Sequence, residues 1–209
     1  SMTHQFPRAS VCLAVSGASG AIYGIRLLRM LLQAETQVEL IYTPAGRRVL
    51  AEECGIVLGT DPAVLWQESD VAADENWPTL VQLHDHQNIG AKPASGSAGI
   101  QTVIVLPCSL DTLAAISMGR AENLVERAAQ VALKEQRQLI LCPRETPLSK
   151  VHLDHMSRLA WAGATILPAC PGFYHQPRRM EDLVDQVCAK VMDVCGISQT
   201  EIFRWQGSE

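Results

Sequence analysis

The stretch at residues 11–24, VCLAVSGASGAIYG, constrains the fold of this chain most strongly. An apolar run breaks into small residues and resumes with helical spacing, which predicts a strand, a tight turn and a helix that starts near Ala21. Gly17 and Gly20 allow a ligand to approach the backbone closely, and the N-terminus of the helix favours a phosphate group. Hydroxyls of Ser16 and Ser19 add donors. The glycine spacing matches neither the dinucleotide fingerprint nor the phosphate-binding loop with its lysine, so an ordinary strand-to-helix turn stays open as the alternative.

Strands and helices alternate along the rest of the chain. Short apolar runs predict strands, and apolar residues at helical spacing predict the helices between them. The strands expected from these runs cover residues 37–43, 80–83, 102–106, 138–142 and 165–167. Residues 55–101 are the least regular part, and we interpret their loop KPASGSAG at 92–99 as functional, because long irregular connections are uncommon in compact domains. The alternation predicts parallel βαβ units, and hence an α/β fold with a parallel sheet in a three-layer sandwich.

Size and composition favour a single domain over residues 1–209, with residues 1–8 as a flexible tail in which Ser1 before Met2 looks like a cloning remnant. A net charge of −5 gives no basic footprint for nucleic acid, and no long apolar run or basic amphipathic stretch suggests a membrane. Seven cysteines without a C-x-x-C pair favour free thiols in a reducing, cytoplasmic compartment. We therefore expect small molecules or proteins as partners.

Polar or Gly- and Pro-rich loops follow five of the expected strands. These loops read SGASG, TPAG, PCSLDT, PRETP and PACPGFYHQP. Because the carboxyl ends of parallel strands meet at one edge of a sheet, we expect the loops to line one ligand-binding crevice. Arg144, Glu145 and Tyr174 lie in these loops and are candidate site residues, and Lys134 is a further candidate.

Taken in sequence order, these loops are similar to those of the flavin prenyltransferase family, the UbiX proteins. The matching stretches are SGASGAIYG at 16–24, PASGS at 93–97, LPCS at 106–109 with Thr112, NLVERAAQVALKEQRQLILCPRETPL at 123–148, FYHQP at 173–177, and Arg204-Trp205. The resemblance implies a Rossmann-like, flavodoxin-like fold, usually assembled as a homododecamer with FMN bound between protomers. It implies that a dimethylallyl group passes from dimethylallyl monophosphate to N5 and C6 of reduced FMN without a metal. The product, prenylated FMN, then serves a UbiD-type decarboxylase.

The resemblance also assigns roles to individual residues. The family's FMN contacts correspond to Gly17, Ala18, Ser19, Thr43, Ser109, Leu110, Asp111, Thr112 and Arg144. Its prenyl-phosphate contacts correspond to Tyr174 and Lys190, with Lys134 and Arg127 as further cations of that site. Its acidic residues near the flavin and the donor correspond to Glu53 and Glu145, and its C-terminal aromatic residue to Trp205. This chain departs from the residues most common in the family at Thr43-Pro44, Asp111 and Lys190.

The leaving phosphate of such a reaction calls for cations. Lys134, Arg144 and Lys190 would stabilise its charge in place of a metal, and Tyr174 would donate a hydrogen bond. As the alternative, Arg127 and Lys134, which are seven residues apart, form one solvated face of a helix.

The allyl group and the flavin call for other residue types. An aromatic face such as that of Trp205 stabilises a cation-like allyl fragment. Glu145, and with it Glu53, are the acids and bases available for the proton transfers. The alternative for both glutamates is a plain surface charge.

Other chemically suggestive residues have simpler interpretations. The pairs His84-x-His86 and His152-x-x-His155 have spacings that a metal uses, but neither comes with a third ligand, and we interpret them as polar surface histidines. Cys108 has no histidine partner for thiol catalysis and is interpreted as a packed small residue.

Two rival functions remain open at the level of sequence. One is an FMN-dependent decarboxylase of cysteine-type substrates, a related family that carries a Pro-x-Met-Asn motif where this chain has Pro-Arg-Glu-Thr at 143–146. The other is a non-catalytic flavin carrier, which would not need cations and Glu145 around a second anion site.

Overall fold

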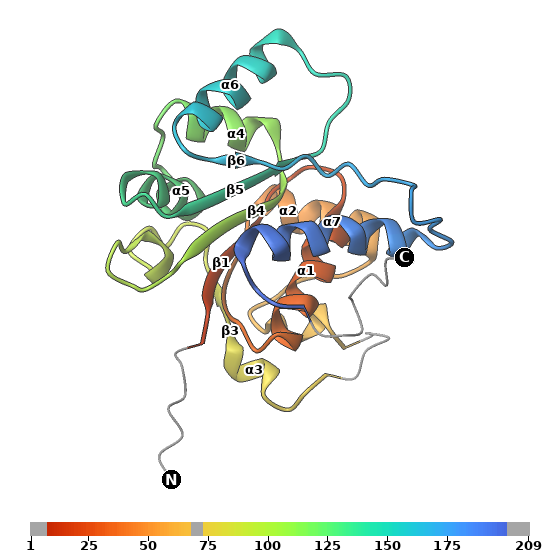
Figure 1. Cartoon of the computed structure of the whole chain (residues 1–209). Coiled ribbons are helices and arrows are strands. Elements are labelled where there is room, and N and C mark those ends of the chain that lie inside the picture. The colour runs from red at the N-terminus through yellow and green to blue at the C-terminus, as the bar shows by residue number, and fades with distance from the viewer. Residues whose placement is uncertain (1–7, 68–72, 200–209) are drawn as a thin grey trace.

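The computed structural model of the chain describes residues 8–67 and 73–199 (Figure 1). Six parallel strands form one sheet in the order β3-β2-β1-β4-β5-β6. The strands are β1 (Ser10–Val15), β2 (Gln37–Tyr42), β3 (Val81–His84), β4 (Thr102–Cys108), β5 (Gln138–Pro143) and β6 (Thr165–Ile166). The α/β class and the parallel sheet predicted from the sequence are confirmed. Residues 1–7 of the tail predicted at residues 1–8 lie outside the described residues, and so does Trp205.

Helices cover both faces of the sheet, which gives three layers (Figure 1). One face carries α1 (Ala21–Gln33), α2 (Pro44–Cys54) and α7 (Met180–Cys195), and the other carries α4 (Leu110–Ser117), α5 (Leu124–Lys134) and α6 (Lys150–Trp161). Alternation along β1 explains the two cores. Leu13 and Val15 pack toward α1 and α7, whereas Cys12 and Ala14 pack toward α4 and α5.

The long connection at residues 55–101 is irregular, as predicted, but part of it belongs to the core. It contains the short helix α3 (Trp77–Leu80), the strand β3 and two 3₁₀ turns at Pro62–Leu65 and Lys92–Ala94. The buried rings of Trp66 and Trp77 meet edge to face with centroids 6.0 Å apart. This aromatic contact attaches the connection to the α1 face.

The strand order locates the ligand edge. From the neighbouring strands β1 and β4, the chain builds the sheet outward in both directions, so the loops that follow these two strands diverge. In sheets of this topology the crevice between such loops is the binding site. The Gly17 loop follows β1 and the Ser109 turn follows β4, so both loops lie at the edge where the sequence analysis expects the crevice.

Candidate functional site

Ser16 joins the loops that follow β1 and β4. Its hydroxyl donates to the Pro107 carbonyl at 2.9 Å and accepts from the Ser109 N–H at 2.8 Å. Ser16 is buried, so its hydroxyl holds the two loops together and does not serve as the ligand donor expected from the sequence. Ser109 in turn caps α4, because its hydroxyl accepts from the Thr112 N–H at 3.1 Å.

Glu53 fills the N-terminus of α1. Its carboxylate accepts hydrogen bonds from the Ser19 hydroxyl at 2.6 Å, the Gly20 N–H at 2.8 Å and the Ala21 N–H at 3.0 Å. The sequence predicted a phosphate at this helix end, but here a carboxylate from α2 takes the anion position. Burial raises the pKa of Glu53, yet these hydrogen bonds and the charge of Arg144 outweigh burial and hold the pKa below its usual value.

The lowered pKa of Glu53 predicts how the stability of this loop depends on pH. Because the pKa is lower in the folded state, Glu53 stabilises the fold above its ordinary pKa of 4.5, and this contribution is lost as the pH falls through the lowered value. Glu53 is exposed, so we expect a contribution of at most about 1 kcal/mol. The free energies of unfolding in urea of wild type and Glu53→Gln should differ at pH 6, and the difference should shrink as the pH is lowered below 4.5. A difference that grows on acidification would contradict this assignment.

Backbone and guanidinium donors next to Glu53 remain available for a ligand. Among the described residues, no group accepts a hydrogen bond from the N–H of Gly17, Ala18 or Ser19. Arg144 uses its Nε to bind the Ser19 carbonyl at 3.2 Å, which leaves its two terminal nitrogens without a partner in that part of the chain. This set of donors fits an anionic ligand.

Hydroxyl groups complete the crevice. Thr43 caps α2 by accepting from the Gly46 N–H at 2.9 Å, and its hydroxyl proton is still available. The partly exposed hydroxyl of Thr112 accepts from Ser109 at 2.9 Å and is likewise a donor toward the crevice. Leu110 is half-buried and Asp111 exposed at the same turn. Phosphate, ribityl hydroxyls and a flavin ring find donors of the right kind here, so these residues fit FMN.

The glycine at the start of the loop permits this packing. A Cβ on Gly17 would lie 2.5 Å from the Ala45 Cβ at the start of α2. Any larger side chain would push the loop off α2, and the three free N–H groups would move with it.

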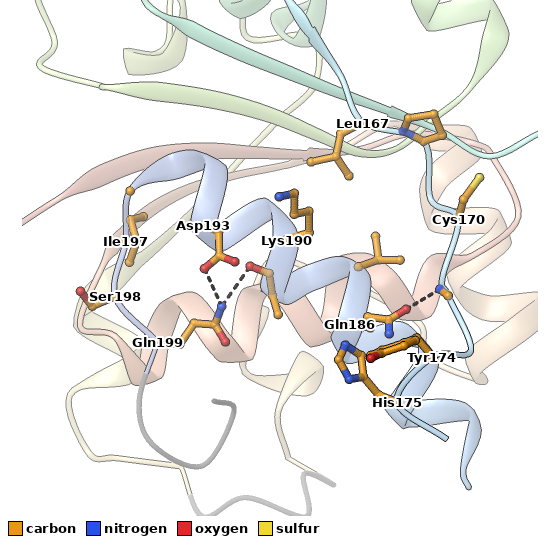
Figure 2. A pocket seen from close by; sticks show the side chains of 15 residues that line it. Leu167, Cys170, Tyr174, His175, Gln186, Lys190, Asp193, Ile197, Ser198 and Gln199 are labelled. Atoms are coloured by element: carbon orange, nitrogen blue, oxygen red, sulfur yellow. Dashed lines mark hydrogen bonds between the residues drawn. The ribbon is translucent and has the colours of Figure 1, made fainter. Parts of the chain in front are cut away.

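Tyr174 and Lys190 line one cavity of about 940 Å³ (Figure 2). The cavity lies between the segment at 167–175, α7 and residues 196–199. The Tyr174 ring is 91% exposed and meets His175 edge to face. Lys190 makes no ion pair with a described residue. Asp193, which also lines the cavity, instead accepts a hydrogen bond from Gln199 at 3.1 Å. The structure therefore brings together the two residues predicted to contact the prenyl phosphate.

Tyr23 lies between the Gly20 turn and α7, since a Cβ on Gly20 would be 2.8 Å from the Tyr23 ring and the Cys188 thiol of α7 donates to the Tyr23 carbonyl at 3.5 Å. Burial is the main cause that raises the pKa of Tyr23; the Cys170 thiol raises it further, and the charge of Arg144 lowers it. Helix α7 also lines the cavity, through Gln186, Val187 and Lys190, so Tyr23 contacts elements of both sites. Helix α7 is fixed on α1 beside them by the Arg26–Asp185 ion pair at 2.7 Å.

Lys134 and Arg127 lie away from the cavity that contains Tyr174 and Lys190. Both belong to α5, on the opposite face of the sheet from α7. Lys134 is exposed just before β5 begins, whereas Arg144 follows the end of β5, and a strand of this length separates its ends by about 17 Å. One chain does not bring Lys134 to Arg144. Arg127 is half-buried, and its Nε has no hydrogen-bond partner within the described ranges.

Glu145, His84 and Cys108 were also singled out from the sequence, and the structure shows the surroundings of each. Glu145 is exposed, and its carboxylate accepts only from the neighbouring Thr146 N–H at 3.0 Å among described groups. The surface interpretation is wrong for His84, which is buried and binds the buried Glu39 at 2.6 Å. A charged residue in the apolar strand QVELIY was the signal for this pair. Cys108 is buried and packed, as predicted, and burial raises the pKa of its thiol to about 12.

Neither a metal cluster nor a membrane span is found in the part of the chain that the structure describes. No three His, Cys, Asp or Glu side chains come together there as metal ligands do. No helix in the same ranges has the length and apolar character needed to cross a bilayer.

The fold and the donor-lined crevice define an α/β flavoprotein, and residues 1–194 match the family model described as Flavoprotein. The chain belongs to the flavin prenyltransferase UbiX family, because the curated Flavin prenyltransferase UbiX of Pseudomonas aeruginosa is 44% identical over 199 residues, which cover 93% of each chain. The crystal structure of AnUbiX (PadA1) in complex with FMN and dimethylallyl pyrophosphate superposes with a TM-score of 0.80 at 34% identity, over 97% of this chain and 100% of that one. A dodecameric FMN-dependent UbiX-like decarboxylase from Escherichia coli O157:H7 gives a TM-score of 0.78 at 33% identity, over 95% of this chain and 100% of that one.

Proposed function

We propose that this chain transfers a dimethylallyl group from dimethylallyl monophosphate to N5 and C6 of reduced FMN, and so makes prenylated FMN for a UbiD-type decarboxylase. The observation that carries this proposal is a pair of sites with Tyr23 between their elements: a crevice rich in donors, and a cavity whose Lys190 makes no ion pair with a described residue. A transferase needs two such sites, one for the acceptor and one for the donor phosphate. A flavin carrier needs only the first. We place the reaction in the cytoplasm, where the free cysteines of the described residues stay reduced.

The residues of the crevice bind and orient FMN, whose reduced ring supplies the nucleophilic N5 and C6. The N–H groups of Gly17, Ala18 and Ser19 and the terminal nitrogens of Arg144 hold its anionic and polar groups. Glu53 stays ionised because of its lowered pKa, and it therefore acts as a proton acceptor through the Ser19 hydroxyl that donates to it.

The residues of the cavity bind the donor phosphate. Lys190 and Tyr174 supply a cation and a hydroxyl donor, and these stabilise the phosphate as it leaves. Glu145 acts as the second acid or base, for the proton transfer that Glu53 does not perform. Trp205 covers the allyl group in this proposal and lies outside the described residues.

Lys134 and Arg127 reach the donor phosphate from a second copy of the chain. Their distance from Arg144 within one chain supports this arrangement, and so do the large side chains that a monomer would expose, such as Trp161 at 89% and Phe173 at 73%. The dodecameric UbiX-like neighbour is consistent with a homododecamer here.

Assembly of this kind gives a direct prediction. Light scattering of the purified protein should yield a mass larger than that of two 22.8 kDa chains. Dilution should reduce flavin binding and mass together, because a site that spans two copies is lost when they separate. A stable monomer with FMN bound would contradict the shared site.

The function itself is tested by the fate of the flavin. The protein is incubated without oxygen with reduced FMN, dimethylallyl monophosphate and EDTA, and we expect a flavin whose mass and absorbance show an added fourth ring. Unmodified FMN would exclude the transferase and leave the carrier. A decarboxylated cysteine-type substrate in a parallel incubation would favour the decarboxylase instead, although this chain has Pro-Arg-Glu-Thr at 143–146 where that family has Pro-x-Met-Asn.

A further inference from the structure

A buried acid lies on the α5 face of the sheet, away from the crevice. Glu39 on β2 is only 4% exposed, and its two oxygens have different partners. Oε2 binds His84 Nε2 at 2.6 Å, and Oε1 binds Lys92 Nζ at 2.9 Å. Strand register explains the first contact, because Ile41 pairs with His84 and Glu39 stands two positions earlier on the same face.

Stability alone does not explain this cluster. An ion pair removed from water gains little over apolar residues of the same size, because desolvation cancels most of the attraction. Every neighbouring position in β2 from Val38 to Tyr42 is apolar, so an apolar residue would fit at position 39. Burial raises the pKa of Glu39, but His84 and Lys92 lower it by more, so the acid stays charged and its hold on Lys92 persists. A positional role fits these facts better.

Lys92 is the first residue of the loop at 92–99, the loop that the sequence marked as functional. Pro93 behind it is buried, and Ala94 and Ala98 pack on the core beneath α5. The other end of the loop is held by Arg137, which donates to the carbonyls of Gly96 and Ile100. The Glu39–Lys92 contact is therefore the ionic attachment of the first half of the loop.

This loop lies against the cation that the proposed function uses. A Cβ on Gly96 would be 3.2 Å from Glu135 Oε1, and the same oxygen lies 3.8 Å from Lys134 Nζ. The Glu135 carboxylate thus lies between the Gly96 backbone and the Lys134 ammonium. The position of the loop therefore bears on the surroundings of the Glu135 carboxylate and of the lysine ammonium beside it.

We propose that Glu39 is a positioning residue for donor binding: through Lys92 it fixes the 92–99 loop against the end of α5, and so sets the position of Lys134. This inference rests on the proposed function, in which Lys134 contacts the donor phosphate. Glu39 itself touches neither substrate.

The test variant removes the Lys92 ammonium and keeps Glu39 paired with His84. Lys92→Met retains chain length and leaves the Glu39–His84 contact in place. In single-turnover reactions of the whole protein, we expect the concentration of dimethylallyl monophosphate for half-maximal rate to rise about tenfold, because displacing a binding group by about 1 Å costs up to about 100-fold. The maximal rate and the affinity for FMN should stay within about twofold, since uniform donor binding alone is lost.

Hydrogen exchange gives a second readout that does not depend on the reaction. The N–H groups of Ser95 and Ala98 donate to the Lys92 and Ser95 carbonyls at 3.0 and 3.3 Å. These amides should exchange about tenfold faster in Lys92→Met, because a loop that opens more easily protects its amides less. Lys92→Arg keeps a cation at this position, so its half-saturating donor concentration and its amide exchange should both match those of wild type. The double variant Glu39→Gln/Lys92→Met should be no worse than the single variant with the larger defect, because each change alone already removes the Glu39–Lys92 contact.

Arg120→Met is the matched control. It breaks an exposed ion pair with Glu122 at 2.7 Å, away from the loop, and should change neither readout. Unchanged exchange in Lys92→Met would overturn the anchor. Faster exchange with an unchanged half-saturating concentration would overturn the link to donor binding. If the wild-type protein makes no prenylated flavin, but amides of the loop still exchange faster in Lys92→Met than in wild type, the proposed function is overturned and the Glu39–Lys92 anchor stands.

Discussion

Replacing Arg144 by methionine is expected to weaken FMN binding by about 100-fold, since hydrogen bonds to charged groups contribute about 1.5–3 kcal/mol and every 1.4 kcal/mol is tenfold in affinity. Arg144 already binds the Ser19 carbonyl at 3.2 Å through Nε, and its two terminal nitrogens have no hydrogen-bond partner among the described residues. Methionine keeps much of the length and removes all of these donors. The measurement is a fluorescence titration of oxidised FMN against the purified variant.

Two variants separate the role of Arg144 as a ligand from its role in the loop. Arg144→Lys keeps the charge without the fork of donors, so its affinity for FMN should lie between those of wild type and Arg144→Met. Arg158→Met removes an exposed arginine on α6 and should bind FMN like wild type. An Arg144→Met variant with wild-type affinity would show that the crevice binds FMN through other groups or does not bind it.

The sequence predicted the elements of this fold and the edge at which its loops gather. Apolar runs such as TVIVL and the small residues after VCLAV are local signals, and β4 and the turn before α1 follow from them. The N-caps at Thr43 and Ser109 were equally readable, because the residue types and their place before a helix are local too.

Contacts between distant residues explain what the sequence did not predict. The anion position at α1 looked free because Glu53 lies more than thirty residues away, and only packing of α2 beside α1 brings its carboxylate to the Gly20 N–H. Ser16 looked like a ligand donor until the order of strands placed Pro107 next to it. His84 looked exposed because its partner Glu39 is on another strand.

The separation of Lys134 from Arg144 has the same origin. Both stand within NLVERAAQVALKEQRQLILCPRETPL, and both were expected to stabilise the leaving phosphate. Strand β5 runs between them and carries Arg144 to the opposite edge of the sheet. A strand separates its two flanking residues, whereas a turn would have joined them, so the donor site is divided between copies in our proposal.

Changing Glu145 to glutamine should leave FMN bound and stop formation of the four-ring product. The side chain is exposed, and its only hydrogen bond among described groups, from the Thr146 N–H at 3.0 Å, is one that a glutamine oxygen also accepts. Fold and flavin affinity should therefore stay as in wild type. A glutamine does not exchange a proton, and proton transfer by a positioned side chain contributes about 10²- to 10⁴-fold to rate. Mass and absorbance of the flavin after anaerobic incubation with dimethylallyl monophosphate and EDTA measure this loss.

The same assay distinguishes Glu145 from the other acids of the site. Glu52→Gln changes an exposed neighbour of Glu53 on α2 and should give full product, which controls for loss of a negative charge as such. Glu53→Gln removes the acceptor of the Ser19 hydroxyl proton and should slow product formation while it also loosens the loop. If Glu145→Gln alone gave full product, the proton would have to pass through Glu53 and Ser19, and Glu145 would be a surface charge beside the donor site.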